Sequence, residues 1–452
     1  MMSQGYSEKV KELLDSVGAA FFDRVKIKLA DGLVLEGLLM PRPAFGDPDV
    51  VVLKLDNGYN IGISLQRIVS VELLEKFSPR EAPTPGEEEG SQEDFGQPEP
   101  RVFFVGTGGT IASRVDYVTG AVYPYFTAEE LYSMIPELKR LARISSETLF
   151  SIFSEDMTPS HWQQLASKIG EIFRRESDVK GVVVAHGTDT LHYSAAAMAF
   201  AVQEAPGPIV FVGAQRSSDR PSSDAALNVI GATVVAVHAP FAESVIAMHG
   251  SVNDDTILVH RGVRARKMHT SRRDAFMSIN SKPIAEVDPL RGSLKLSTST
   301  YKGRGDDVVV QASFSDKVAL VKFYPGMSPD IFDFYLEKGF KGLVIEGTGL
   351  GHVSTALIDS VRRLVREGVF VAMASQCIFG RVNMNVYRTG VELIKAGVVP
   401  AGDMIPETAY VKLSWILGQT EDPEEIQRLF TANLAFEISE RSEFDHYPGA
   451  RW

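Results

Sequence analysis

The chain has almost no cysteine, since Cys377 is the only one among 452 residues. An intrachain disulfide is therefore excluded. A single cysteine also fits a reducing compartment, in which we expect Cys377 to be a small buried residue rather than a nucleophile. Long hydrophobic runs are lacking too. The most apolar run, 195–202, is far too short to span a bilayer, and the first residues lack a basic stretch followed by an apolar one. The sequence thus predicts a soluble cytoplasmic protein without a membrane segment.

Positive charge is in deficit. The 46 lysines and arginines are outnumbered by 58 aspartates and glutamates, which gives a net charge of −12. This balance argues against a large nucleic-acid footprint on the chain itself, but not against a partner that supplies one. With 44% hydrophobic and 23% charged residues the composition is that of an ordinary globular protein. The length predicts about three domains.

The N-terminal part, 1–77, has the pattern of a small all-β domain. Apolar residues at helical spacing predict a short amphipathic helix over 7–18, after which the hydrophobic period changes to two. Turn signals such as Asp31-Gly32 then separate about five short strands near 25–29, 33–38, 50–55, 61–65 and 68–74. We expect these strands to close into an SH3-like or Sm-like barrel. It shows no aromatic stacking face, so an assembly or spacer role is as plausible as RNA or peptide binding.

Residues 78–100 are rich in proline, glycine and acid and contain one aromatic residue. Such a segment cannot bury a core, so we expect an extended linker.

Strands and helices alternate from residue 101 onwards, which predicts a parallel, doubly wound α/β sheet over 101–291. A connecting segment, 292–315, then leads to a smaller α/β domain over 316–452. In the first domain we expect strands at 102–105, 181–185, 209–212, 244–248 and 257–260, and helices that begin near 128 and 159 or span 191–204 and 223–237. In the second domain we expect strands at 318–323, 342–345 and 369–374.

A glycine-rich turn follows the first buried strand, in the run Val102-Phe-Phe-Val-Gly-Thr-Gly-Gly-Thr-Ile-Ala112. Its glycines let the backbone approach a ligand, and Thr107 and Thr110 offer hydroxyl groups. By itself this turn is weak support for a site, because tight strand-to-helix turns and phosphate cradles look the same.

A second polar turn, Ala185-His-Gly-Thr-Asp-Thr190, also follows an apolar strand and opens a helix. In a parallel sheet both turns fall at the carboxyl edge, so Thr107 and Thr188 are expected to face one crevice. Asp189 also fits a simple helix cap, and a histidine such as His186 at a strand end is more often structural than a base.

These turns resemble those of the bacterial-type L-asparaginases and their glutaminase relatives. The matching motifs are Thr-Gly-Gly-Thr-Ile at 107–111 and His-Gly-Thr-Asp-Thr at 186–190, with supporting pieces at 154–157, 212–216 and 380–384. The resemblance covers about 101–440. Together with the N-terminal barrel and acidic linker, the chain looks most similar to the family of D subunits of archaeal-type glutamyl-tRNA(Gln) amidotransferases.

The resemblance implies that Thr107 is the nucleophile and that Thr188 acts with Asp189 and a lysine. From its place after the strand at 257–260, that lysine should be Lys267. A lysine beside a threonine and an aspartate lowers the cost of ionising the hydroxyl. The alternative is a solvated basic face, since Arg261, Arg264 and Arg266 precede it.

Two tyrosines compete for the role of the family's mobile-loop tyrosine, which orients the nucleophile as the lid closes. Tyr117, about ten residues after Thr107, is the first candidate, and Tyr123 is the second.

Ser154, Gly187 and Asp189 match family positions that bind the amino-acid end of the substrate. Glu155 joins this set, although secreted asparaginases commonly have glutamine there. An additional carboxylate changes how the amino-acid end is held. The choice between asparagine and glutamine therefore stays open.

The implied function is an amidohydrolase subunit that forms a threonine acyl-enzyme and releases ammonia to a partner. That partner, an E subunit, would bind tRNA(Gln) charged with glutamate and activate it with ATP and Mg²⁺, whereas this chain would bind no cofactor or metal. A homodimer within a D2E2-type complex is expected. The alternatives are a free-standing cytoplasmic L-asparaginase with an accessory N-terminal domain, and a catalytically silent scaffold. A silent scaffold would have no chemical reason to keep two threonines, an aspartate and a lysine.

Overall fold

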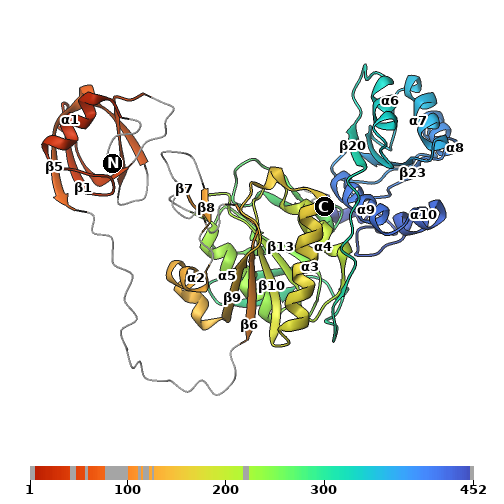
Figure 1. Cartoon of the computed structure of the whole chain (residues 1–452), viewed down its shortest axis with the longest axis horizontal. Helices are drawn as coiled ribbons and strands as arrows, with labels where there is room; N and C mark the ends of the chain where they lie inside the picture. Colours follow the sequence, from red (N-terminus) through yellow and green to blue (C-terminus); the bar gives the residue numbers. More distant parts are fainter. Residues whose placement is uncertain are drawn as a thin grey trace. The chain divides into compact units, whose positions relative to one another are not determined.

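A computed structural model of the chain describes residues 6–40, 47–55, 60–76, 100–109, 113–115, 122–124, 127–216 and 223–447. They divide into two compact units. One contains the N-terminal sheet domain, and the other contains the two α/β domains (Figure 1). The expected linker lies outside the described residues except for Pro100.

The N-terminal domain is a curved five-stranded antiparallel sheet with the strand order β4-β3-β2-β1-β5. Helix α1 is capped by the Ser7 hydroxyl, which accepts from the Val10 amide at 3.4 Å. Alternate residues of β1 are buried, as a period of two requires. The helix and the five strands predicted from the sequence are thus confirmed. Their bounds are α1 (Glu8–Ser16), β1 (Arg24–Leu29), β2 (Val34–Met40), β3 (Val50–Leu55), β4 (Asn60–Ser64) and β5 (Ile68–Glu75).

The larger α/β domain is built on an eight-stranded sheet with the order β18-β17-β14-β13-β12-β10-β6-β9. Strands β9, β6, β10, β12 and β13 are parallel to one another. Strands β14, β17 and β18 extend the sheet with antiparallel pairing. The doubly wound sheet is confirmed, and it continues into the expected connecting segment, where β18 lies. The bounds are β6 (Arg101–Gly106), β9 (Arg143–Thr148), β10 (Val179–Ala185), β12 (Ile209–Val212), β13 (Ser244–His249), β14 (Ile257–Arg261), β17 (Ala285–Asp288) and β18 (Ser293–Leu296).

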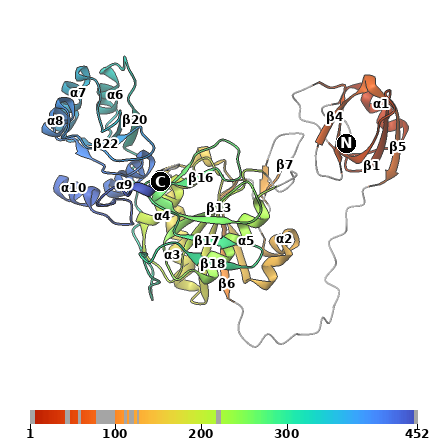
Figure 2. The ribbon, with the colours of Figure 1, turned by 180° about the vertical axis from the view of Figure 1, so that it is seen from behind.

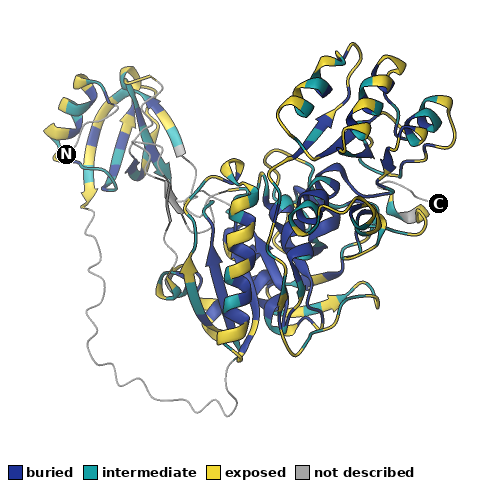
Figure 3. Ribbon diagram, turned by 45° about the vertical axis from the view of Figure 1, so that its right-hand side comes forward, coloured by how far each residue is buried: buried dark blue, intermediate teal, exposed yellow. Residues whose placement is uncertain are grey.

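Helices cover both faces of this sheet (Figures 1 and 2). Phe103 and Val105 of β6 share a core with α3 and α4, whereas Val102 and Phe104 share the opposite core with α2 and α5. Strands buried on both faces are why the sequence reads as continuous apolar runs, and Figure 3 shows them buried between helices with exposed outer faces. The helices are α2 (Ala128–Met134), α3 (Pro159–Arg175), α4 (Leu191–Ala201) and α5 (Ala225–His238).

Two local predictions were wrong. The helix expected over 191–204 ends at Ala201, because the next residues form β11 (Val202–Glu204), which pairs with β19 (Val309–Val310). Cys377 is exposed rather than buried, because it lies in the loop after β22 (Phe370–Ser375).

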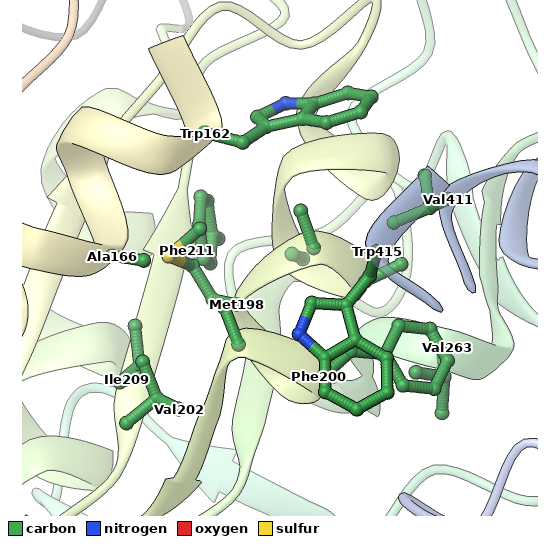
Figure 4. Packing of buried hydrophobic residues seen from close by; sticks show 14 of the residues in the cluster. Trp162, Ala166, Met198, Phe200, Val202, Ile209, Phe211, Val263, Val411 and Trp415 are labelled. Atoms are coloured by element: carbon green, nitrogen blue, oxygen red, sulfur yellow. The ribbon is translucent and has the colours of Figure 1, made fainter. Parts of the chain in front are cut away.

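The C-terminal domain has a parallel sheet in the order β20-β21-β22-β23. One face packs on α6, α7 and α8, and the other on α9 and α10. Helix α9 also joins the core of the larger domain, where Trp415 stacks on Phe200 of α4 at 6.1 Å between ring centroids (Figure 4). The bounds are β20 (Val318–Lys322), α6 (Asp330–Glu337), β21 (Gly342–Gly347), α7 (Ile358–Arg366), β22 (Phe370–Ser375), α8 (Arg388–Lys395), β23 (Val399–Pro400), α9 (Pro406–Gln419) and α10 (Pro423–Thr431).

Two short hairpins complete the described strands. The first pairs β7 (Ser113–Val115) with β8 (Val122–Pro124), and the second pairs β15 (Ala265–Lys267) with β16 (Phe276–Ser278).

Candidate active site

The two polar turns meet at the carboxyl edge of the large sheet. Strands β6 and β10 are parallel neighbours, and Gly106 lies opposite Ala185 in their register. The next residue, Thr107, is 1% exposed. Its backbone amide and its hydroxyl both donate to the carbonyl oxygen of Ala185, at 3.0 and 2.9 Å. The candidate nucleophile is therefore anchored to the end of β10, the strand that leads into the turn with Thr188.

Glycine is required in these turns because the backbone segments lie in direct contact. Gly108 has a φ of +106°, and a Cβ there would lie 2.1 Å from the carbonyl oxygen of Ile152. Gly109 has a φ of +88°, and a Cβ would lie 2.5 Å from the amide nitrogen of Gly187. A Cβ on Gly187 would in turn lie 2.8 Å from that of Ser154. The turn after β6, the turn after β10 and the segment around Ser154 thus form one tightly packed floor.

Lys267 reaches this floor from the β15–β16 hairpin. Its ammonium group donates to the hydroxyl of Thr188 at 2.8 Å and to Oδ1 of Asp189 at 2.7 Å. The Lys267 side chain is 11% exposed and that of Asp189 is 69% exposed, so the cation is held inside and the carboxylate lies at the opening. An ammonium in this position stabilises negative charge on the threonine oxygen. A solvated basic face is excluded, since Arg264 is also buried.

His186 is a structural residue in this arrangement. Its ring nitrogens lie 2.8 Å from the Ser194 hydroxyl and 2.7 Å from the Gly187 carbonyl oxygen. Burial lowers the pKa of His186 to about 4, so the ring is neutral at ordinary pH. It orders the turn that carries Thr188.

The expected substrate-binding residues differ in exposure. Ser154 is buried, and its carbonyl oxygen accepts from the Thr190 hydroxyl at 2.5 Å, which ties Ser154 to the second turn. Glu155 is exposed beside it. Gly187 belongs to the second turn and packs against Gly109 of the first turn and against Ser154. Thr190 was not singled out from the sequence as a functional residue, although its place in the second motif was the available signal.

The structure does not decide between the two candidate loop tyrosines. Tyr117 lies outside the described residues, as does Thr110, and Tyr123 is described only as a backbone position in β8.

Arg266 and Glu407 form an ion pair next to Lys267, and the sequence did not single it out as a pair. The Arg266 Nε lies 3.1 Å from Glu407 Oε1. The sequence offered one signal for Arg266: successive side chains of a strand point in opposite directions, so the neighbour of Lys267 had to point away from the active site.

Metal-binding clusters and membrane-spanning helices are both absent from the described part of the chain. No group of three or more His, Cys, Asp or Glu side chains there is arranged to hold a metal ion. None of the helices described is both long and apolar enough to cross a membrane.

Comparisons with known proteins match every domain. Residues 101–300 match the family Asparaginase, N-terminal, residues 317–430 match the Glutaminase/Asparaginase C-terminal domain, and residues 19–74 match the GatD N-terminal domain. Among solved structures, the thermostable L-asparaginase from Thermococcus kodakarensis is similar with a TM-score of 0.67 and 30% identity. That similarity covers 75% of this chain and 100% of the asparaginase.

Curated relatives extend the similarity to the whole chain. The D subunit of the glutamyl-tRNA(Gln) amidotransferase of Metallosphaera sedula is 48% identical over 451 residues, which is 100% of this chain and 99% of the relative. The corresponding protein from Pyrococcus furiosus, which has the same name, is 50% identical over 436 residues, 95% of this chain and 98% of the relative. The chain therefore belongs to the family of glutamyl-tRNA(Gln) amidotransferase D subunits, which is built on asparaginase-type domains.

Proposed function

We propose that the chain is the ammonia-producing subunit of a tRNA-dependent amidotransferase that acts in the cytoplasm. It hydrolyses the side-chain amide of glutamine or asparagine and supplies the ammonia to a partner that converts Glu-tRNA(Gln) to Gln-tRNA(Gln). The observation that carries this proposal is the contact of Lys267 with both Thr188 and Asp189, one strand away from Thr107.

Thr107 acts as the nucleophile in this proposal. Its hydroxyl first leaves the Ala185 carbonyl, to which it donates at 2.9 Å, by rotation of the side chain. Thr107 Oγ1 then attacks the carboxamide carbon, a C–O bond forms and the C–N bond breaks. The hydroxyl proton passes through Thr188, which Lys267 holds, to the leaving nitrogen, which departs as ammonia. Water hydrolyses the resulting ester and restores the Thr107 hydroxyl.

The amino-acid end of the substrate binds at the opening of the site. The exposed carboxylate of Asp189 suits a substrate ammonium group, and Ser154 with the backbone at Gly187 suits its carboxylate. Glu155 adds negative charge at the opening of the site, which favours binding of the substrate's ammonium group.

The partner supplies the RNA-binding surface and the ATP and Mg²⁺ chemistry, which is consistent with the net charge of −12 on this chain. No cofactor is assigned to this chain. We further propose a homodimer inside a D2E2-type complex. Light scattering that finds only monomer would contradict the dimer.

A free-standing L-asparaginase is the second candidate, favoured by the similarity to the Thermococcus enzyme. That enzyme covers 75% of this chain, whereas the Metallosphaera protein covers all of it. The extent of the match therefore supports the amidotransferase assignment.

The test is ammonia release from glutamine and asparagine by the complex of this chain with its partner and Glu-tRNA(Gln). Thr107→Ala and Thr188→Ala should each abolish release while the variants stay folded. Intact amide hydrolysis in either variant would overturn the proposal.

A further inference from the structure

The strand that carries Lys267 is attached to the C-terminal domain one residue earlier. Lys267 and Arg266 are neighbours on β15, so their side chains leave the strand in opposite directions. Lys267 reaches the active site, whereas Arg266 pairs with Glu407, in the first turn of α9. The catalytic lysine and the first turn of α9 are therefore linked through one short piece of backbone.

Other contacts fix the base of the same hairpin on the same part of the C-terminal domain. The Thr408 hydroxyl donates to the carbonyl oxygen of Val263 at 2.9 Å. Arg264 and Asp403 form an ion pair at 2.9 Å in which both side chains are 1% exposed. Just after β16, the second strand of the hairpin, Asn280 donates to the carbonyl oxygen of Asp403 at 3.0 Å. Both ends of the hairpin thus rest on residues 403–408.

Within this set the Arg266–Glu407 pair is the least completely bonded. Arg264 also donates to the Phe436 carbonyl and the Ser439 hydroxyl, at 2.8 Å each. Glu407 is buried, yet its Oε2 has no hydrogen-bond partner among the described residues. Burial raises the pKa of Glu407, and the charge of Arg266 opposes this shift. A buried carboxylate with one unbonded oxygen is costly, so the pair contributes little to stability.

The pair is placed instead to set geometry. Two other charged groups of the C-terminal sheet edge, Glu346 and Lys322, act on Glu407 electrostatically and pair with each other at 3.4 Å. Glu407 is thus influenced by charges of the C-terminal sheet and pairs with Arg266 on the strand of Lys267. Val411 and Trp415 of α9 pack in one apolar core with Phe200 of α4 and with Val263, which precedes the hairpin (Figure 4).

We infer that Glu407 is a positioning residue for Lys267: through Arg266 it fixes β15 so that the lysine ammonium stays on Thr188 and Asp189. The inference rests on the proposed function, because it takes Lys267 to act in amide hydrolysis. Its consequence is that the C-terminal domain sets the geometry of a site built on the larger domain.

The test is a double-mutant cycle on the complex of the full chain with its partner and Glu-tRNA(Gln), with glutamine as substrate. Glu407→Gln keeps the shape of the side chain and removes its charge. It should lower kcat about fivefold and change KM less than about twofold. In a Lys267→Ala background the same change should have no further effect, because the group that Glu407 positions is absent. Glu425→Gln is the matched control, since it breaks an exposed ion pair with Arg428 on α10 and should leave kcat unchanged.

The outcomes separate this inference from the proposed function. An equal fall in kcat in both Lys267 backgrounds would show a merely structural role and overturn the inference, as would an unchanged kcat in Glu407→Gln. Lys267→Ala with the wild-type rate would overturn the catalytic assignment itself. If Glu407→Gln does not fold, Arg266→Lys perturbs the ion pair through the arginine while keeping its positive charge. Its effect on kcat is then compared with Lys267 present and with Lys267 replaced by alanine.

Discussion

Replacement of Lys267 by methionine should lower activity strongly and leave the fold intact. Methionine has similar length and no charge, so the change deletes the hydrogen bonds at 2.8 Å to Thr188 and 2.7 Å to Asp189. The hydroxyl of Thr188 then has no cation beside it to stabilise negative charge on its oxygen. The chemical step, rather than substrate binding, should suffer most.

The magnitude follows from the environment of the pair. General acid–base contributions of this kind are about 10²-fold or more, and 10²-fold corresponds to about 2.7 kcal/mol in the activation barrier. The effect on folding should be much smaller. The Asp189 carboxylate is 69% exposed, and such a solvent-screened ion pair contributes under about 1 kcal/mol to stability.

The assay is ammonia release from glutamine by the complex, together with thermal unfolding of the variant. We expect kcat to fall at least about 10²-fold while the unfolding midpoint stays close to that of the wild type. A fall of less than about tenfold in a folded variant would refute the role of Lys267. An equal loss of activity in a variant that is also strongly destabilised would point to a structural lysine.

Three further predictions concern the fold around the site. Gly108→Ala should destabilise the protein by more than about 1 kcal/mol in chemical unfolding, because φ is +106° and the new Cβ would lie 2.1 Å from a backbone oxygen; unchanged stability would contradict the packed floor. Asp403→Ala should cost about 3–5 kcal/mol in the same assay, since it leaves Arg264 buried without its ion partner; a cost below about 1 kcal/mol would contradict this. The pKa of His186 is about 4 when folded and 6.5 ordinarily, so protons bind the unfolded chain first. Stability should therefore fall between pH 6.5 and 4 by up to about 1.4 kcal/mol per unit. This component should be absent in His186→Gln, and equal pH profiles for the two proteins would contradict it.

The meeting of the two turns was predictable from the sequence. A buried strand followed by a polar turn occurs twice, and parallel strands bring such turns to one edge. Thr107 and Thr188 therefore lie in turns that follow neighbouring strands, as Gly106 opposite Ala185 in the register shows.

The placement of Lys267 was not predictable from local pattern. It is 78 residues from Asp189 in the chain, and it reaches the site only because the β15–β16 hairpin is fixed by long-range contacts. The prediction that Lys267 acts with Thr188 and Asp189 came from the resemblance to the family.

Buried ion pairs were likewise beyond sequence reasoning. Charged residues usually lie on the surface. Yet in the pairs Arg264–Asp403 and Lys412–Glu437 each side chain is at most 1% exposed. The end of α4 was also predicted wrongly from local propensity. The apolar helix pattern continues past Ala201, but there the chain pairs as β11 with β19.

In the proposed function the chain makes ammonia for a tRNA-dependent partner. The most direct test compares ammonia release from glutamine and from asparagine by the purified chain alone with release in the presence of the partner and Glu-tRNA(Gln). We predict slow or no turnover by the chain alone and a marked increase when the partner and the charged tRNA are both present. High turnover by the chain alone, unchanged by partner and tRNA, would contradict the proposed function and identify a free-standing asparaginase.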